Sequence, residues 1–417
     1  MKLVLLVVST IIFVNINASE ISDQRPPGVT GETWQFGPLN RWAYTHISEI
    51  LPTKSITNNS GFVQPIPGIK EAKNDLQINL DGRTVLLSSL MEDQFIDGIL
   101  IIKNGTAIAE LYSGTLKPDR THLMWSVSKT IAGLTAASVE AEGLINLGKT
   151  VSDYVPELSD SGWGNNTLRE ILDMRDSSSW VEDYDSPEST VRRQDCADGL
   201  LTGPMCIDTE VIGNYKFLPA VGRDNSRRGK FIYKSGTTDV MAWVLESATG
   251  KRYADIVSDR LWKPIGAENN AGITVDVSGF TLASGGMFAS LRDTAKIGQL
   301  ILNKGKVGAI QVIPENWIKD MSNQPGDNSI ESLGDQSINP YYRSFIWGIG
   351  DGEGSLLARG VHGQFIYISP NSGVVITIFS TWPNADGGIL GVGLDSTMSI
   401  IEAVSYTHLT LPTIYSV

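Results

Sequence analysis

Runs of apolar and β-branched residues near both ends of the chain predict the strands of one sheet. Residues 98–112 contain two such runs on either side of Asn104-Gly105, a dipeptide typical of a two-residue hairpin turn. Further along, the runs 364–369 and 374–379 flank the turn sequence Pro370-Asn-Ser-Gly373. Because these hairpins lie far apart in the sequence, we expect both ends of the chain to complete one sheet.

Between the two hairpins, apolar positions recur with helical spacing, and Gly and polar residues interrupt them. The stretch 176–228 shows no such period and contains both cysteines and many acids, which is typical of a functional or tethered loop. The mixture of helices and strands predicts an α/β (α+β) protein. The helical patterns cover residues 126–142, 168–174, 238–249, 252–261, 293–302 and 394–404.

The two ends of the chain differ from the rest. Lys2 precedes the uncharged run 3–14, and Ala18 is a small residue suited to cleavage, so residues 1–18 are predicted to be a signal peptide. The alternatives are a buried strand and an uncleaved anchor. A signal peptide predicts export to the periplasm or beyond, with no membrane association after cleavage. Residues 405–417 break the preceding helical pattern and are predicted to be a non-native tail.

The composition is that of a globular protein. The 417 residues are 41% apolar and 19% charged, which suits two to three structural units at roughly 150 residues each. The net charge of −13 argues against nucleic acid and anionic membranes as partners. Two cysteines are too few for a cysteine-rich zinc site, and the four histidines never have the i, i+4 spacing of a zinc-peptidase helix. These two kinds of zinc site are therefore not expected, and the reaction that the motifs below predict needs no metal and no organic cofactor.

The segment Ser126-Val-Ser-Lys129 opens the helical pattern 126–142 and carries the first candidate chemistry. Positions i and i+3 share one face of a helix, so the Ser126 hydroxyl and the Lys129 amine should lie together. Residues 131–139 carry no charge, which predicts a buried helix. Burial and the positive end of a helix both favour a neutral amine, as a general base requires, and the Ser126 N–H could bind an oxyanion. The alternative is a helix cap beside a snorkelling lysine.

Two later segments carry further candidates. Tyr233-Lys-Ser235 follows a short apolar run and precedes a helix, and a tyrosine hydroxyl beside a lysine amine can pass a proton to a leaving group. The alternative is a buried core tyrosine. His362-Gly-Gln364 begins the strand of the second hairpin, where Gly363 would allow a ligand or backbone to approach closely. A purely structural role for His362 is the alternative.

Taken together, these three segments resemble, in order and spacing, the motifs of the class C β-lactamase-like, penicillin-recognising serine hydrolases. Residues 144–157 and 283–293 also resemble that family, and the likeness extends over about residues 30–403. It implies a β-lactamase-like fold, an antiparallel sheet flanked by helices. The implied domains are an α/β part formed by residues 19–145 and 286–404 and an inserted all-helical part formed by residues 146–285.

Segments 39–53 and 173–187 resemble, more narrowly, the 6-aminohexanoate-dimer hydrolase branch of that family. This resemblance implies that Ser126 is the nucleophile, Lys129 its base and Tyr233 the proton relay. It also implies that Tyr184 contacts the substrate and that Asp195 binds a substrate amine, although Asp195 could instead be a solvated loop acid.

The sequence departs from the wider family at the later motifs. His362-Gly363-Gln364 stands where the family has Lys-Thr-Gly, whose lysine helps bind a β-lactam carboxylate, so we do not expect penicillinase activity. Ser235 replaces an asparagine and removes an amide donor to the substrate carbonyl. We expect these four residues to contact the substrate, with the Gln364 N–H in the oxyanion site.

Cys196 and Cys206 are ten positions apart in a chain that we expect to be exported, where disulfides persist. We therefore predict a bridge between them, which would also fix the loop at Asp195. The alternative is two separate buried thiols.

The function that these features predict is hydrolysis of a small amide or ester through a serine acyl-enzyme. The alternative is a penicillin-binding-type receptor that becomes acylated but turns over slowly.

Overall fold

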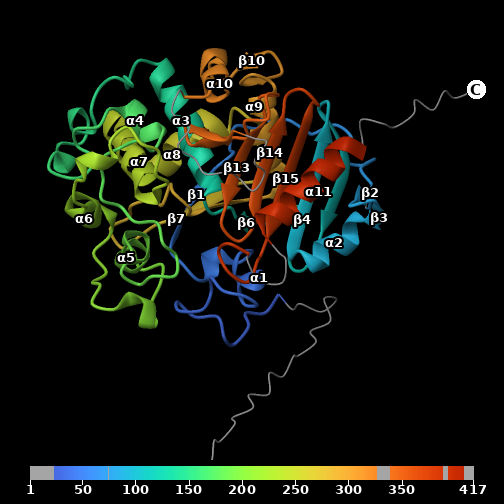
Figure 1. The fold of residues 1–417 in the computed structure, drawn as a ribbon, viewed down its shortest axis with the longest axis horizontal. Helices are drawn as coiled ribbons and strands as arrows, with labels where there is room; N and C mark the ends of the chain where they lie inside the picture. Colours follow the sequence, from blue (N-terminus) through green and yellow to red (C-terminus); the bar gives the residue numbers. More distant parts are fainter. Residues whose placement is uncertain (1–22, 74, 326–338, 388–392, 408–417) are drawn as a thin grey trace, which may run out of the picture.

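The central element of the computed structural model is a seven-stranded antiparallel sheet with the order β11-β12-β13-β14-β15-β4-β5 (Figure 1). The structure describes residues 23–73, 75–325, 339–387 and 393–407. Strand β15 pairs with β4 from Val374–Lys103 to Ser380–Ile96. The prediction that both ends of the chain complete one sheet is therefore confirmed. The strands are β4 (Ile96–Lys103), β5 (Thr106–Tyr112), β11 (Tyr341–Arg343), β12 (Ile346–Gly348), β13 (Leu356–Gly360), β14 (Gln364–Ser369) and β15 (Val374–Ser380).

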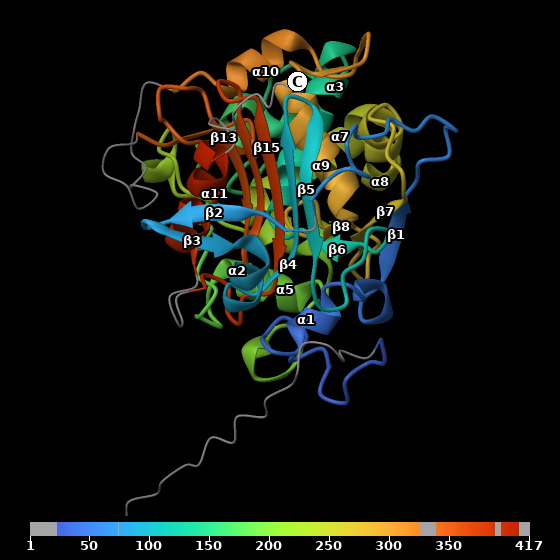
Figure 2. The ribbon, with the colours of Figure 1, turned by 90° about the vertical axis from the view of Figure 1, so that its right-hand side faces the viewer.

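Helices cover both faces of this sheet because its central strands are apolar on both faces. Along β4, Leu100 and Ile102 belong to the core cluster that includes helix α9, whereas Ile99 and Ile101 pack with the cluster that includes α11. Figure 2 shows the sheet between these two layers. The covering helices are α2 (Leu87–Asp93), α9 (Leu291–Leu302) and α11 (Leu394–Thr407).

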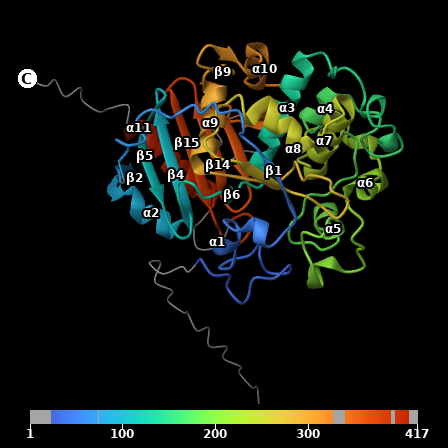
Figure 3. The ribbon, with the colours of Figure 1, turned by 180° about the vertical axis from the view of Figure 1, so that it is seen from behind.

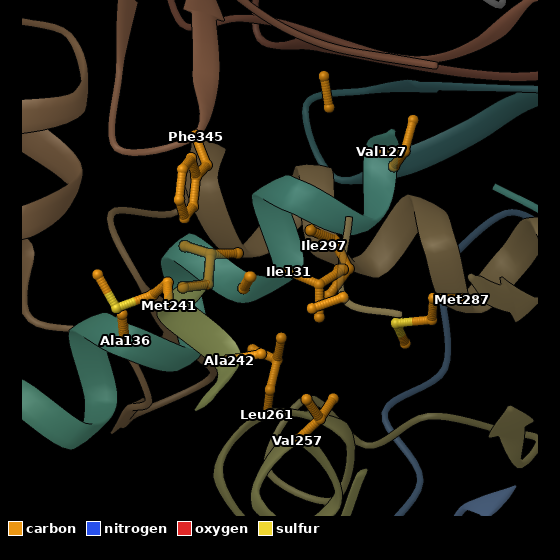
Figure 4. Close-up of a cluster of buried hydrophobic side chains, with 14 of the residues drawn as sticks. Val127, Ile131, Ala136, Met241, Ala242, Val257, Leu261, Met287, Ile297 and Phe345 are labelled. Carbon is orange, nitrogen blue, oxygen red and sulfur yellow. The ribbon is translucent and has the colours of Figure 1, made fainter. Parts of the chain in front are cut away.

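Helix α3 (Val127–Ala141) lies in the centre of the largest core cluster, between the sheet and the other helices (Figure 3). Its residues Ile131 and Ala136 contribute to the packed side chains in Figure 4, together with Met241 of α7 and Phe345 beside the sheet. The prediction of a buried helix over 126–142 is confirmed. The other main helices are α4 (Leu168–Leu172), α7 (Ser235–Thr249), α8 (Tyr253–Val257) and the π-helical η8 (Ser258–Trp262).

A second antiparallel sheet has the order β1-β7-β8-β6 and connects the helical region to the nucleophile segment. Strand β7 (Ala271–Thr274) lies inside residues 146–285, so the expectation of an all-helical segment is wrong at this point. The short apolar run at 271–274 is buried throughout and pairs with β1 and β8, an arrangement that local helical periodicity does not reveal. The domain boundaries stay a prediction. The partners of β7 are β1 (Thr53–Ile56), β6 (His122–Leu123) and β8 (Met287–Ala289).

The acid-rich stretch 176–228 is folded around short helices rather than being irregular throughout. Cys196, in α5, forms a disulfide with Cys206, as predicted. Helix α7 begins at Ser235, three residues before the predicted start at Thr238. The short helices of the stretch are α5 (Thr190–Ala197), η5 (Gly203–Cys206), α6 (Asn214–Phe217), η6 (Leu218–Ala220) and η7 (Asn225–Arg227).

Replacing both Cys196 and Cys206 by Ala should lower the free energy of unfolding by about 3 kcal/mol. Without the bridge the unfolded chain has more conformational freedom, so the variant loses more entropy on folding. Urea unfolding of the variant and of the wild type, with and without reductant, measures this difference. Reductant should lower the midpoint of the wild type and leave the variant unchanged. Equal midpoints for oxidised and reduced wild type would contradict the prediction.

The two ends of the chain were predicted to lie outside the fold. The predicted signal peptide, residues 1–18, lies outside the described residues. Helix α11 continues to Thr407, so the helical pattern does not break at residue 405 as expected, and the non-native origin of the tail stays a prediction. Residues 408–417 lie outside the described residues. Within the part of the chain that the structure describes, no helix has the length and apolar character to cross a bilayer.

The remaining elements are short and lie around this frame. They are α1 (Asn40–Ala43), η2 (Ile47–Glu49), β2 (Gln77–Leu80), β3 (Arg83–Leu86), η3 (Val151–Asp153), η4 (Pro156–Leu158), β9 (Lys306–Val307), β10 (Ile310–Gln311) and α10 (Glu315–Met321).

Candidate active site

Ser126 is the N-cap residue of α3, three positions after the end of β6 at Leu123. The preceding residue, Trp125, has a φ of 46°, a left-handed conformation that non-glycine residues adopt infrequently. This sharp turn brings Ser126 to the boundary of two cavities, and it lines both of them. The backbone N–H groups in the first turn of a helix have no intrahelical acceptor. The Ser126 N–H is therefore available at the same position as its hydroxyl.

The side chain of Lys129 reaches back to Ser126 from one turn further along α3. Its Nζ lies 2.8 Å from Ser126 Oγ, 3.0 Å from Ser235 Oγ and 2.7 Å from the Ser284 carbonyl oxygen. Lys129 is 1% exposed, so the alternative of a snorkelling lysine is wrong. The predicted pairing of Ser126 with Lys129 is present, and Ser235 completes the group.

The directions of these hydrogen bonds fix the role of each partner. The Ser284 carbonyl can only accept, and the Ser235 hydroxyl donates to Glu182, so Lys129 must donate to both. A neutral amine then has one lone pair left, and among these three partners only the Ser126 hydroxyl can donate to it. In the structure Lys129 Nζ donates to all three oxygens, and an amine that gave up one proton would direct its lone pair at the Ser126 hydroxyl.

Glu182 holds this network in place and was not identified from the sequence. Its Oε1 accepts hydrogen bonds from the hydroxyls of Ser235, at 2.5 Å, and Tyr184, at 2.6 Å. Its Oε2 accepts from the Ser235 N–H at 2.8 Å and the Trp180 indole at 2.6 Å. The only local signal is one acid among many in the stretch 176–228, and Ser235 is 53 residues away in the sequence.

The carboxylate of Asp239 positions Ser284, the third hydrogen-bond partner of Lys129. Asp239 accepts a 2.9 Å hydrogen bond from the N–H of Ser284, and the Gln194 amide donates to its other oxygen at 2.8 Å. Burial raises the pKa of Asp239 to about 6. Asp239 therefore fixes the loop whose Ser284 carbonyl oxygen accepts a hydrogen bond from Lys129.

Tyr233 lines the larger of the two cavities, which has a volume of about 750 Å³. Its ring lies 5.1 Å from Lys129 Nζ and stacks on Trp347 with ring centroids 5.7 Å apart. Tyr233 is only partly buried, so the alternative of an enclosed core tyrosine does not fit. Tyr184 lines both cavities, and burial raises the pKa of its hydroxyl.

The smaller cavity, about 40 Å³, contains Asp195 and His362 beside Ser126. Asp195 is not a solvated loop acid: its side chain is 14% exposed and forms an ion pair of 2.9 Å with Arg192. Burial raises the pKa of Asp195 to about 6, and Arg192 opposes that shift. The acid thus faces the site, but it already has a cationic partner.

His362 has a structural contact besides its position in the cavity wall. Its Nδ1 lies 2.7 Å from the Trp382 carbonyl oxygen, which can only accept, so Nδ1 carries the proton. Burial lowers the pKa of His362 to about 4. The neutral ring stacks on Trp125 with ring centroids 5.8 Å apart and so supports the turn before Ser126.

The assignment of the oxyanion donor to the Gln364 N–H stays a prediction. The Gln364 amide group donates to the carbonyls of His362 and Ser380, and neither Gln364 nor Gly363 lines the two cavities. Gly363 has a φ of 85° and forms the turn between β13 and β14.

The residues beside the nucleophile belong instead to the end of β13. A Cβ atom on Gly360 would lie 2.7 Å from the Met124 carbonyl oxygen and 3.0 Å from Ser126 N, so only glycine permits this approach. The next residue, Val361, lines both cavities with Ser126. Strands β13 and β14 have similar apolar patterns. The sequence therefore did not show which of them reaches the nucleophile.

Comparison with known proteins agrees with this geometry. The sequence profile of the Beta-lactamase family matches residues 86–389, and this protein belongs to that family. It is 32% identical over 363 residues to the 6-aminohexanoate-dimer hydrolase of Paenarthrobacter ureafaciens, covering 86% of this chain and 89% of the relative. The family and the fold predicted from the sequence are therefore confirmed.

Two solved structures extend the comparison. A Bacillus anthracis protein provisionally named a 6-aminohexanoate-dimer hydrolase superposes with a TM-score of 0.81 at 27% identity, over 93% of this chain and 98% of that one. EstCE1, described as a hydrolase with promiscuous acyltransferase activity, superposes with a TM-score of 0.59 at 16% identity, over 76% and 96% of the two chains. The second likeness concerns the fold alone.

Within the described ranges, no group of three or more His, Cys, Asp or Glu side chains is arranged to hold a metal ion. The chemistry described below uses only side chains and backbone groups of the chain.

Proposed function

We propose that this protein hydrolyses small amides or esters through an acyl-enzyme on Ser126. The observation that carries the proposal is the contact of Lys129 Nζ with Ser126 Oγ at 2.8 Å, while Ser235 Oγ and the Ser284 carbonyl oxygen accept its other two hydrogen bonds. A deprotonated amine held in this way would direct its lone pair at the Ser126 hydroxyl. The likeness to 6-aminohexanoate-dimer hydrolases favours linear amides.

In the first half of the reaction, Lys129 takes the proton of Ser126 as Oγ bonds to the substrate carbonyl carbon. The negative charge on the carbonyl oxygen is stabilised by the N–H groups of Ser126 and Val361. Tyr233 passes a proton to the leaving nitrogen or oxygen as its bond to the carbonyl carbon breaks, and the proton on Lys129 replaces the one that Tyr233 gives up.

In the second half, water attacks the acyl-enzyme along the same path. The water gives one proton to Tyr233, and the proton of Tyr233 passes to Lys129. Lys129 then returns a proton to Ser126 Oγ when the ester bond breaks. The carboxylic acid leaves, and the enzyme regains its starting state. The partly enclosed site keeps these charges away from bulk solvent, which strengthens each electrostatic contact.

The slow receptor is the second candidate, and a p-nitrophenyl ester assay separates the two. A hydrolase releases many equivalents of nitrophenol per enzyme at a steady rate. A receptor of the penicillin-binding type gives one stoichiometric burst followed by almost no release, and that outcome would reject the proposed hydrolase.

We further propose that Asp195 favours substrates with a protonated amine on the acyl side. The smaller cavity places Asp195 near Ser126, although the Arg192 ion pair weakens the field of the carboxylate. A charge-assisted contact is worth about 1.5–3 kcal/mol, so an amine-bearing amide should exceed its N-acetylated form by roughly tenfold to a hundredfold in kcat/KM. Because the Arg192 ion pair weakens this contact, we expect a preference at the lower end of that range.

The measurement compares the two substrates in the wild type and in Asp195→Asn. The preference should disappear in the variant while the rate with the N-acetylated substrate stays similar. An equal preference in both proteins would remove Asp195 from substrate binding.

Export is part of the same proposal. The N-terminal pattern of Lys2 followed by an apolar run supports it, and the Cys196–Cys206 disulfide suits an oxidising compartment. Expression of the full chain in a Gram-negative host, followed by N-terminal sequencing, tests it. A periplasmic or secreted product beginning near residue 19 is expected, and a cytoplasmic product with an intact N-terminus would contradict it.

A further inference from the structure

Lys234 is a fully buried lysine between two residues of the proposed active site, Tyr233 and Ser235. Its backbone is extended, with a φ of −150° and a ψ of 110°, so its side chain points to the side opposite those of its two neighbours. Tyr233 lines the larger cavity and Ser235 the smaller one, whereas Lys234 lines neither. The amine that the sequence suggested beside the Tyr233 hydroxyl therefore lies behind the site, and the mechanism above gives it no role.

Lys234 instead forms an ion pair with Asp176, and neither of these two side chains is exposed. Its Nζ donates to Asp176 Oδ1 at 2.9 Å and to the carbonyl oxygen of the same residue at 2.7 Å. Burial lowers the pKa of Lys234, and the Asp176 carboxylate opposes that shift. The same segment is also attached at Met174, whose carbonyl oxygen accepts the Ile232 N–H at 3.2 Å. Because charge-assisted hydrogen bonds are stronger than neutral ones, the ion pair is the main contact that fixes residues 232–234.

The two neighbours of Lys234 depend on this anchor to different degrees. Ser235 has its own support, since the carboxylate of Glu182 accepts both its N–H and its hydroxyl. The Tyr233 ring stacks on Trp347, and in the described part of the chain its hydroxyl has no hydrogen-bond partner. The direction of the Tyr233 hydroxyl is therefore set by ring packing and by the backbone at Lys234. Loss of the ion pair should displace Tyr233 more than Ser235.

We infer that the ion pair of Lys234 and Asp176 positions Tyr233, and that it determines how well the enzyme cleaves amides relative to activated esters. This inference rests on the proposed acyl transfer at Ser126. When the C–N bond of an amide breaks, its electron pair stays on the nitrogen, which takes a proton from the Tyr233 hydroxyl and leaves as an amine. A p-nitrophenolate leaves with the electron pair of the C–O bond and needs no proton, because its charge is delocalised over the ring. Formation of the acyl-enzyme thus requires an accurately placed Tyr233 for amides but not for activated esters.

The test compares a p-nitroanilide and a p-nitrophenyl ester of one acyl group, so that both substrates give the same acyl-enzyme and kcat/KM reports acylation alone. The variant combines Lys234→Met with Asp176→Asn, because a single change would leave the other charge buried without a partner. It should lower kcat/KM by about 30–100-fold for the anilide and by no more than about threefold for the ester. Asp176→Asn alone keeps an oxygen acceptor for Lys234 Nζ and should show a smaller loss of the same kind. Urea unfolding checks that each variant is folded.

Lys296→Met is the matched control, because Lys296 is another buried lysine, in an ion pair of 3.1 Å with Asp293, and it lines neither cavity at Ser126. Its urea midpoint should fall, but the ratio of the anilide and ester kcat/KM values should stay that of the wild type. Equal losses with both substrates in the double variant, or no loss with either, would overturn the inference. Wild-type turnover of the ester but not of the anilide would also overturn it and would leave the proposed serine hydrolase in place. If the wild type turns over neither substrate, the proposed hydrolase is rejected together with this inference.

Discussion

Ser126→Ala should abolish turnover of esters and amides, by at least about a thousandfold, because the variant has no nucleophile to form the acyl-enzyme. Lys129→Ala should lower kcat by roughly 10²–10⁴-fold, since the Ser126 hydroxyl then loses the amine 2.8 Å away that accepts its proton. Steady-state kinetics with a p-nitrophenyl ester measures both losses. Circular dichroism should show that both variants remain folded.

A fluorophosphonate probe tests the same assignment without turnover. It should label the wild type at Ser126 and fail to label Ser126→Ala. Ser128 is the nearest rival, but it is 1% exposed and its hydroxyl accepts the N–H of Met287 in β8. Ser128→Ala therefore serves as the matched control and should keep its labelling. Labelling that persists in Ser126→Ala would identify another serine as the nucleophile.

Glu182→Gln should lower kcat by about a hundredfold, although Glu182 is not expected to touch the reacting bond. Its carboxylate accepts the Ser235 hydroxyl proton, and this forces Ser235 to accept from Lys129. A glutamine amide can donate to Ser235 instead, and the Ser235 hydroxyl would then donate to Lys129. The lone pair of Lys129 would be occupied by Ser235 rather than by Ser126, so proton transfer from the nucleophile would slow.

A positioning role for Glu182 predicts a loss in kcat with little change in KM, together with slower acylation by the fluorophosphonate probe. Asp183→Asn is the matched control, because Asp183 is an exposed acid in the same cavity whose side chain accepts the backbone N–H groups of Asp185 and Ser186. It should leave kcat within about twofold of the wild type. If Glu182→Gln and Asp183→Asn behave alike, the carboxylate of Glu182 has no specific role.

The sequence was informative where the chemistry is local. The spacing of Ser126 and Lys129 sets their contact, because residues three apart share a helix face wherever that helix packs. The hairpins at Asn104-Gly105 and 370–373 were predicted for a similar reason, since a short turn and its flanking strands are neighbours in the sequence. The close spacing of Cys196 and Cys206 likewise favoured their disulfide.

The rest of the candidate site was decided by tertiary structure. Glu182 and Ser235 are neighbours only because the acid-rich stretch folds back on the start of α7, and no local pattern separates Glu182 from the acids around it. Gly360 rather than Gly363 meets the nucleophile because the end of β13 reaches Ser126, a contact that tertiary packing decides. By itself the sequence predicted the nucleophile and its base and identified the family of the fold. The contact of the β13 end with Ser126 and the carboxylate that orients Ser235 depend on distant segments, which only the packed structure brings together.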